Sequence, residues 1–129
     1  MSDTSVSRVT TTTLLWTNPS PTTAFVAQTV PLDLSNYDAV KIVALFVENT
    51  NSSFVTELPV GSEDRAISYF YLNTTNTTNA STFLNGCSRT ASVSTTGITF
   101  GKGQMIYIGN SYVDWNNRAI PWKIYGIKY

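Results

Sequence analysis

The residues with the most evident chemistry form one short run near the end of the chain, where aromatic and polar side chains alternate. The run comprises Tyr112, Asp114, Trp115, Asn116, Asn117 and Arg118. Tyrosine and tryptophan rings offer an apolar face for stacking, and the carboxylate, amide and guanidinium groups beside them offer planar hydrogen-bonding partners. This combination is suited to gripping a sugar ring or a protein hot spot. We therefore take the run as a candidate receptor-binding or glycan-binding site.

A structural interpretation of the same run competes with the binding one. The run falls in a polar segment between two apolar stretches, which is typical of a long hairpin loop. In that case Asn116 and Asn117 form the turn, and Trp115 folds back onto the core. We favour this structural interpretation for Trp115. The other two tryptophans considered, Trp16 and Trp122, lie inside expected strands and are assigned to the core or to a subunit interface.

Groups that support catalysis are scarce in this sequence. Because there is no histidine, a Ser-His-Asp arrangement is impossible, and a metal site would depend on carboxylates and carbonyls. The single cysteine, Cys87, has no histidine to activate it and is interpreted as a buried side chain. The nearest acid pairs, Asp33 with Asp38 and Glu63 with Asp64, fall in expected turns, where acids commonly cap backbone amides. We therefore expect no enzyme activity, no metal and no cofactor.

The run Gly101-Lys102-Gly103 resembles part of a phosphate-binding loop only superficially. It lacks the remaining glycine spacing of such loops, and no helix is expected after it. We interpret it as a tight connection between two strands, with glycines that can adopt positive φ.

Composition narrows the class of protein further. Hydrophobic residues make up 42% of the 129 residues, which is ample for one core, whereas charged residues make up 12%. The eight basic and eight acidic side chains cancel and form no long run, so we expect no binding to nucleic acid. The first residues have neither a basic start nor an apolar stretch, so we expect no signal peptide. No apolar run approaches the roughly 20 residues of a membrane helix, so we expect no membrane insertion.

The elements that must position these groups are strands joined by polar turns. Apolar residues do not repeat at helical spacing, and good helix formers are sparse. The run 40–47 is apolar on both faces apart from Lys41, which predicts a central strand covered on two sides. Because proline has no backbone N–H to donate to a neighbouring strand, the segment that contains Pro31 must have one unpaired side there. Strand-like segments recur at residues 10–16, 25–30, 40–47, 66–72, 89–95, 105–108 and 119–129. A short eighth candidate is 54–60, and residues 98–100 resume the segment 89–95 after a turn.

Seven or eight short strands spaced by turns predict a single-domain, all-β, antiparallel β-sandwich of the jelly-roll or immunoglobulin-like kind. We expect residues 1–9 to form an N-terminal arm and residues 10–129 to form the sandwich. The segment from Asn73 to Ser81 consists only of Asn, Thr, Ser and Ala. It fits either an exposed loop or a polar edge strand.

Both ends of the sandwich also show a family resemblance. The stretch from Leu15 to Val43, which includes Trp16, Phe25 and Tyr37, resembles the opening of small β domains at the C-termini of bacteriophage tail-fibre and receptor-binding proteins. The ending from Ile120 to Tyr129 is similar to theirs as well. Together the two stretches cover about a third of the chain, and the resemblance does not extend to the middle.

The resemblance implies a virion structural protein, a sandwich that assembles as a homotrimer, contacts other virion proteins and attaches to the surface of a host bacterium. It implies a chain made in the host cytoplasm and incorporated into the virion. Such domains usually follow a long fibrous or baseplate-binding region, whereas here the domain is expected almost from the first residue. A stand-alone decoration or head-fibre protein therefore stays open beside a tail fibre.

Two alternatives from other classes also stay open. One is a lectin-like carbohydrate-binding module of a bacterial surface protein, which would need Tyr112 and Trp115 exposed along a groove. The other is a small carbohydrate-active enzyme, which would need two acids that converge in a cleft, about 5 to 10 Å apart. The receptor is a host glycan or a host protein, and the sequence does not choose between them.

Overall fold

The computed structural model describes residues 9–47, 52–74, 82–107 and 113–129, which contain ten strands and no helix. None of these residues therefore forms a helix that could cross a membrane. In chain order the strands are β1 (Thr11–Thr17), β2 (Gln28–Pro31), β3 (Ala39–Val47), β4 (Ser53–Pro59), β5 (Arg65–Thr74), β6 (Thr82–Ser94), β7 (Gly97–Phe100), β8 (Gln104–Tyr107), β9 (Val113–Asp114) and β10 (Arg118–Lys128).

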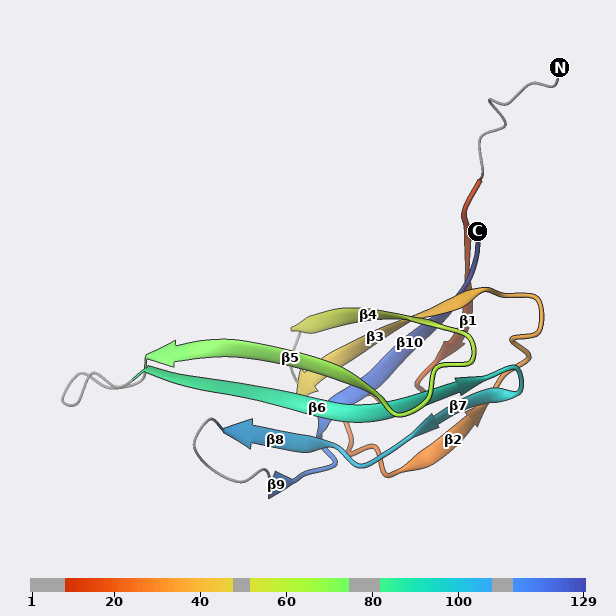
Figure 1. Cartoon of the computed structure of the whole chain (residues 1–129). Helices are drawn as coiled ribbons and strands as arrows, with labels where there is room; N and C mark the ends of the chain where they lie inside the picture. The colour runs from red at the N-terminus through yellow and green to blue at the C-terminus, as the bar shows by residue number, and fades with distance from the viewer. Residues whose placement is uncertain (1–8, 48–51, 75–81, 108–112) are drawn as a thin grey trace, which may run out of the picture.

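The strands form two antiparallel sheets that pack face to face (Figure 1). One sheet has four strands in the order β1-β10-β3-β4. The other has six, in the order β2-β7-β6-β8-β9, with β5 paired to the long strand β6. The predicted all-β antiparallel sandwich is confirmed. The expected number of strands, seven or eight, was too low, partly because β9 has only two residues and carries little pattern of its own.

The core lies between the two sheets. Alternation along β3 directs Val40, Ile42 and Ala44 inward, and all three are at most 1% exposed. Ile67 on β5 and Ile98 on β7 face them from the other sheet. The remaining core residues come from the same strands and the loops beside them: Phe25, Val30, Leu34, Leu45, Leu58, Ala91, Val93, Phe100, Ile120 and Ile124.

Strand β3 is central within its sheet, as predicted, because β10 and β4 flank it. The expectation that both of its faces are covered is wrong. Lys41 and Val43 point away from the core and are only partly buried, and Val43 pairs with Val55, which is 58% exposed. The Lys41 ammonium lies 4.5 Å from the ring centroid of Tyr125, so the outer face is shielded by its own side chains.

Strand β10 holds a proline in the middle of its sheet because the register with β3 shifts there. The shift lies between Pro121 and Lys123, and it leaves Trp122 as the extra residue. Asn18, 6% exposed, satisfies the backbone beside this bulge, since its side-chain amide donates to the Pro121 carbonyl over 2.9 Å. Its own N–H donates to the Trp122 carbonyl over 2.8 Å. Trp16 and Trp122 both pack partly buried against the core, in line with expectation.

Two strand boundaries differ from the prediction. Strand β6 begins at Thr82 rather than near Arg89, because the glycine at position 86 lies in the strand and makes room for Phe70 across the ladder. Strand β2 begins at Gln28 rather than at Phe25, whose N–H donates to the Asn116 carbonyl instead of joining a ladder. Pro31 ends β2 at a sheet edge, as expected.

The polar segment from Asn73 to Ser81 is described only at its start. Asn73 and Thr74 belong to β5, where they pair with Phe83 and Thr82 of β6. The rest of this segment, residues 75–81, lies outside the described residues, as does most of the expected N-terminal arm.

Candidate binding site

The candidate site lies on the turn that leads from β9 into β10. Asn116 and Asn117 form its centre, because the N–H of Arg118 donates to the Trp115 carbonyl over 3.0 Å. The N–H of Trp115 donates to the Gly103 carbonyl over 2.7 Å, which ties the turn to the segment before β8. The structure therefore places both asparagines in a turn, as the structural interpretation expects. Tyr112 lies outside the described residues.

Asn116 is committed to holding the turn in place. Its side-chain oxygen accepts the Gly103 N–H over 3.1 Å, and its carbonyl accepts the Phe25 N–H over 2.9 Å. The Phe25 ring is buried between Trp16 and Phe100, with edge-to-face contacts to both. The turn is thereby fastened to the core, and the Asn116 oxygen points into the protein rather than toward a ligand.

A buried arginine, Arg89 on β6, forms the inner support of this turn. It is 1% exposed, and its guanidinium donates to four backbone carbonyls. Those carbonyls belong to Gly101 at 2.7 Å, Ala119 at 2.9 Å, Arg118 at 3.0 Å and Asn116 at 3.1 Å. The four acceptors come from both ends of the 115–118 turn and from the loop between β7 and β8. One side chain therefore fixes three segments relative to one another.

The charge of Arg89 is stabilised by carbonyl dipoles, since the described residues place no carboxylate in ion-pair contact with it. The Phe25 ring adds a cation–π contact, at 5.3 Å from the guanidinium carbon to the ring centroid. Burial lowers the pKa of Arg89 to about 10, and the nearby Cys87 thiol opposes this shift. Arg89 is therefore still protonated near neutral pH.

The sequence contained a signal for this residue. Ala91 and Val93 alternate onto the inner face of β6, and continuing that period by one step places Arg89 on the same face. What the pattern does not contain is the identity of the four acceptors, because they are backbone groups from segments brought together by the fold.

Gly103 is needed for space rather than for an unusual backbone angle. A Cβ atom at this position would lie 2.5 Å from the Trp115 carbonyl oxygen, 2.6 Å from that of Arg118 and 2.7 Å from an Arg89 nitrogen. Neither Gly101 nor Gly103 has a positive φ, so the proposed reason for these glycines was wrong. The close approach of three polar groups is the physical cause.

On the outer side of the turn, the exposed ring of Trp115 is held by the guanidinium of Arg118. Trp115 is 45% exposed, and the guanidinium carbon of Arg118 lies 4.0 Å from its ring centroid. Arg118 also lies 5.9 Å from the Phe46 ring centroid, and it donates to the Asn117 side-chain oxygen over 2.8 Å. The Nε of Arg118 has no hydrogen-bond partner. Trp115 therefore does not fold back into the core, contrary to the favoured interpretation.

Asp114 is exposed beside this ring and is balanced by its neighbours. Lys102 places its ammonium 3.7 Å from the carboxylate, and the Gln104 side-chain amide donates to it over 3.3 Å. Lys102 lies just before β8, and Gln104 is the first residue of β8 and pairs with Asp114 in the β8–β9 ladder, so these contacts extend that pairing onto the surface. The Asp114 side chain is 51% exposed, and it directly precedes Trp115 in the sequence. Its carboxylate is therefore open to solvent.

An aromatic pocket adjoins the site through Phe46, which the sequence did not single out. The Tyr69 ring stacks on Phe54 with centroids 5.7 Å apart and meets Phe46 edge-on at 5.9 Å. With Ser52 and Ser53 these rings line a pocket of about 170 Å³. The three rings come from the consecutive strands β3, β4 and β5, but β5 belongs to the other sheet, so no local pattern predicts the pocket.

Three of the acidic side chains considered for catalysis, Asp33, Asp38 and Asp64, have different neighbours. Asp33 accepts hydrogen bonds from the hydroxyl and N–H of Ser35, which lower its pKa. Asp38 contacts Lys128 at 3.7 Å, and Asp64 lies within hydrogen-bond distance of Ser92. Among the residues that the structure describes, no group of three or more acidic or cysteine side chains is placed to hold a metal ion.

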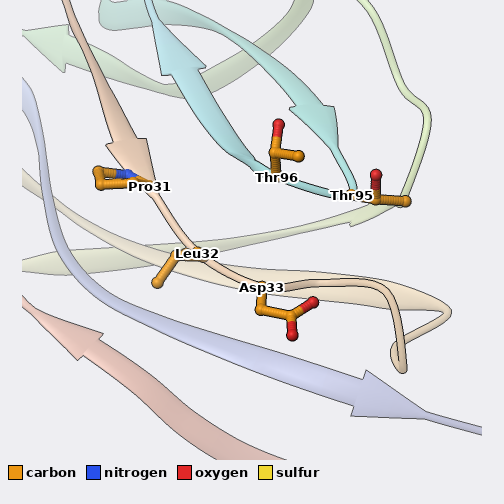
Figure 2. A pocket seen from close by; sticks show the side chains of 5 residues that line it. All are labelled: Pro31, Leu32, Asp33, Thr95 and Thr96. Atoms are coloured by element: carbon orange, nitrogen blue, oxygen red, sulfur yellow. The ribbon is translucent and has the colours of Figure 1, made fainter.

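One of these acids, Asp33, borders an open hollow of about 430 Å³ between the end of β2 and the β6–β7 turn. Figure 2 shows the residues that line it, namely Pro31, Leu32, Asp33, Thr95 and Thr96. In that view the Asp33 carboxylate points away from the hydroxyl groups of Thr95 and Thr96. The hollow therefore contains one carboxylate without a second catalytic group turned toward it.

Cys87 is completely buried on β6, which confirms its interpretation as a core side chain. Burial raises the pKa of its thiol to about 11, against weaker opposing effects from backbone hydrogen bonds and from Arg118 and Arg89. The thiol is therefore protonated at neutral pH and has little nucleophilic character.

A scan of family models, a search of curated proteins and a search of solved structures found no match to this chain.

Proposed function

We propose that this chain is a non-enzymatic bacteriophage virion protein, of the tail-fibre, head-fibre or decoration type, that binds a glycan on the host cell surface. In this proposal it assembles with other virion proteins and as a homo-oligomer, for which the family resemblance implies a trimer. The glycan contact is made by Trp115, with Asp114, Asn117 and Arg118 beside it.

One observation supports the binding role above the others. Nearly half of the Trp115 surface is exposed, yet the ring is held by Arg118 at 4.0 Å, on a turn whose backbone is bonded to a buried arginine. An exposed aromatic side chain is usually mobile, and ordering it on binding costs free energy. Here that ordering is largely complete before a ligand arrives, which favours binding.

The geometry also narrows the set of ligand-binding groups. Asn116 is removed from the set because its oxygen serves the Gly103 amide inside the protein. Trp115 offers a flat apolar surface for the C–H face of a pyranose ring, and Asp114 offers an exposed acceptor for its hydroxyl groups. A sugar stacked in this way would meet both groups from the outer side of the turn.

Binding to an array of bacterial capsular, lipopolysaccharide and teichoic-acid glycans tests this proposal. We expect the wild-type protein to bind a subset of them, Trp115→Ala to bind at least about tenfold more weakly, and Trp115→Phe to keep part of the affinity. Val55→Ala is the matched control, because Val55 is also exposed and lies on β4. Equal binding by Trp115→Ala, or no glycan bound by the wild type, would overturn the glycan role.

Two further measurements separate the proposal from its alternatives. Mass spectrometry of purified phage particles should detect the chain, whereas detection only in bacterial envelope fractions favours a lectin-like module of a bacterial surface protein. Incubation with a bound glycan should release no new reducing ends. Release of reducing ends would favour a carbohydrate-active enzyme.

A further inference from the structure

The N-terminal strand β1 lies at one edge of the four-stranded sheet, where β10 is its partner and the order of strands stops (Figure 1). Along the side away from β10, none of the described residues pairs with it. A strand in this position presents unpaired backbone N–H and C=O groups, which are a template for a further strand.

The pairing shows which groups point outward. The Ile127 carbonyl on β10 accepts the Asp38 N–H, so the backbone groups of Ile127 face β3. Since these directions alternate along a strand, the groups of Gly126 and Lys128 face β1 instead. Their partners, Thr13 and Thr11, bond to β10, and the intervening Thr12 and the following Leu14 direct their N–H and C=O groups outward. Thr12 and Leu14 are therefore the free contacts of this edge.

Three other edges of the sandwich carry features that discourage a further strand, and the first half of β1 does not. Strand β4 has Glu57 and ends at Pro59, β2 has four residues and ends at Pro31, and β9 has two residues. The ten-residue strand β5 also lies at an edge, and it begins at the charged Arg65. From Thr11 to Leu14, β1 has no charge and no proline, and all four residues are exposed. Leu14 is 49% exposed, so its side chain is accessible to a second strand laid along this edge. The irregularity in β1 comes after Leu14.

We propose that a second copy of this chain pairs antiparallel with the free edge of β1. A two-fold axis beside Thr13 brings Thr12 of each copy opposite Leu14 of the other, so the outward groups exchange four hydrogen bonds. This register also places the Leu14 side chain against Thr12 of the other copy, which covers its exposed surface. Because the stretch is uncharged, two identical strands approach without repulsion. The two four-stranded sheets become one continuous sheet.

This pairing goes beyond the glycan role and does not depend on it. It stands in place of the trimer that the family resemblance implies, because an antiparallel contact between identical strands has two-fold symmetry and joins only two copies. The contact lies on β1, whereas the candidate binding site lies on the turn between β9 and β10. Glycan binding and self-association can therefore be tested separately.

Light scattering of the purified protein over a range of concentrations tests the pairing. We expect a mass of twice the 14.2 kDa of the chain. Thr12→Pro removes an outward N–H without removing a bond to β10, so it should restore the single-chain mass with the circular dichroism spectrum unchanged. Thr12→Lys, which places a charge at the edge, should have the same effect. Thr13→Ala is the matched control and should leave the dimer intact, because the Thr13 N–H points inward.

Two results would overturn the pairing. One is a single-chain mass for the wild type at every concentration. The other is a dimer or trimer that persists in Thr12→Lys, which tests the edge even where Thr12→Pro fails to fold.

Discussion

The two sides of the 115–118 turn differ in how completely their polar groups are bonded. On the inner side, Arg89 is buried and donates to four carbonyls, and the Asn116 oxygen accepts an amide from Gly103. On the outer side, Trp115 is 45% exposed and the Asp114 side chain is 51% exposed. The turn is therefore held in place by hydrogen bonds on its inner side, and its outer side is accessible to solvent and to a ligand. Arginine has a different role on each side: Arg89 supports the turn on the inner side, and Arg118 holds the exposed Trp115 ring on the outer side.

The comparison predicts that the largest loss of stability follows from a change on the inner side. Arg89→Ala removes the guanidinium donor from four carbonyls, of which the Asn116 carbonyl keeps the Phe25 N–H, and each group left without a donor costs about 1–3 kcal/mol where water cannot reach it. We expect the free energy of unfolding to fall by about 3 kcal/mol or more, measured by urea denaturation followed by tryptophan fluorescence. Arg89→Lys should restore part of it, since an ammonium also donates. A loss below about 1 kcal/mol would show that Arg89 is not the support of the turn.

Gly103→Ala tests the same side through packing. The added methyl meets two backbone oxygens that cannot rotate away, so we expect a loss of about 3 kcal/mol, at the upper end for overpacking. Gly101→Ala is the matched control, because the atom closest to its added methyl is the side-chain oxygen of Thr90 and the nearest backbone atom lies 3.9 Å away. Thr90 is exposed and its side chain has room to turn, which predicts a smaller loss of about 1 kcal/mol. Equal losses would contradict this account of Gly103.

Cys87, two residues before Arg89 on β6, adds a pH-dependent prediction on the inner side. The pKa of its thiol is about 11 in the folded protein and close to its ordinary value of 9.0 when unfolded. Between these values the unfolded chain loses the proton and the folded protein keeps it, so the contribution of the thiol to stability is full below about pH 9 and falls toward pH 11. The expected loss is about 2 kcal/mol. Cys87→Ala should lack this component in unfolding curves measured at several pH values, and a thiol reagent at pH 8 should label the wild type only after unfolding.

The outer side should behave in the opposite way. Trp115→Ala removes a contact with Arg118 worth about 0.5–1 kcal/mol at an exposed site, so we expect the free energy of unfolding to fall by less than about 1 kcal/mol. The same variant should lose most of its glycan binding. A thermal unfolding curve and a binding isotherm on one sample decide between the two roles. A loss of several kcal/mol in the free energy of unfolding would mean that Trp115 stabilises the fold, as the residues on the inner side do.

The smallest effect is expected for Asp114→Asn. Its ion pair with Lys102 spans 3.7 Å between two side chains that are more than half exposed, and such pairs contribute little to stability. We expect the free energy of unfolding to change by less than about 0.5 kcal/mol, with little dependence on salt. A larger change in thermal unfolding would show that the β8–β9 contact stabilises the turn.

Most strands could be predicted because their side chains alternate. The run 40–47 is rich in β-branched residues, and its inward positions were all found buried. Strand β6 was predicted too short, since the glycine at position 86 lowers the local preference for a strand and is tolerated only because Phe70 of β5 fills its place. That compensation depends on a neighbouring strand, which a local pattern does not contain.

The sequence predicted the site from its residue types. It did not predict which of these side chains hold the turn in place and which face solvent. Aromatic and planar side chains marked residues 114–118, but the choice between an exposed and a buried Trp115 depended on Arg118, which stacks on it in the folded turn. Asn116 looked equivalent to Asn117, and only the Gly103 amide distinguishes them. The Phe46–Tyr69 contact joins strands of different sheets, so it was beyond any argument from spacing.

The order of strands in the smaller sheet has a consequence for the timing of folding. Strand β1 is the first of the ten described strands, yet its partner β10 is the last of them to be synthesised, and Thr11 pairs with Lys128. During translation β1 must therefore wait, unpaired, until almost all of the described chain has emerged. Contacts between such distant residues are slow to form, and a nascent strand edge is prone to join the wrong chain. We expect folding of this sheet to be limited by closure of the β1–β10 ladder, and neighbouring nascent chains on one messenger to be the chief source of misassembly.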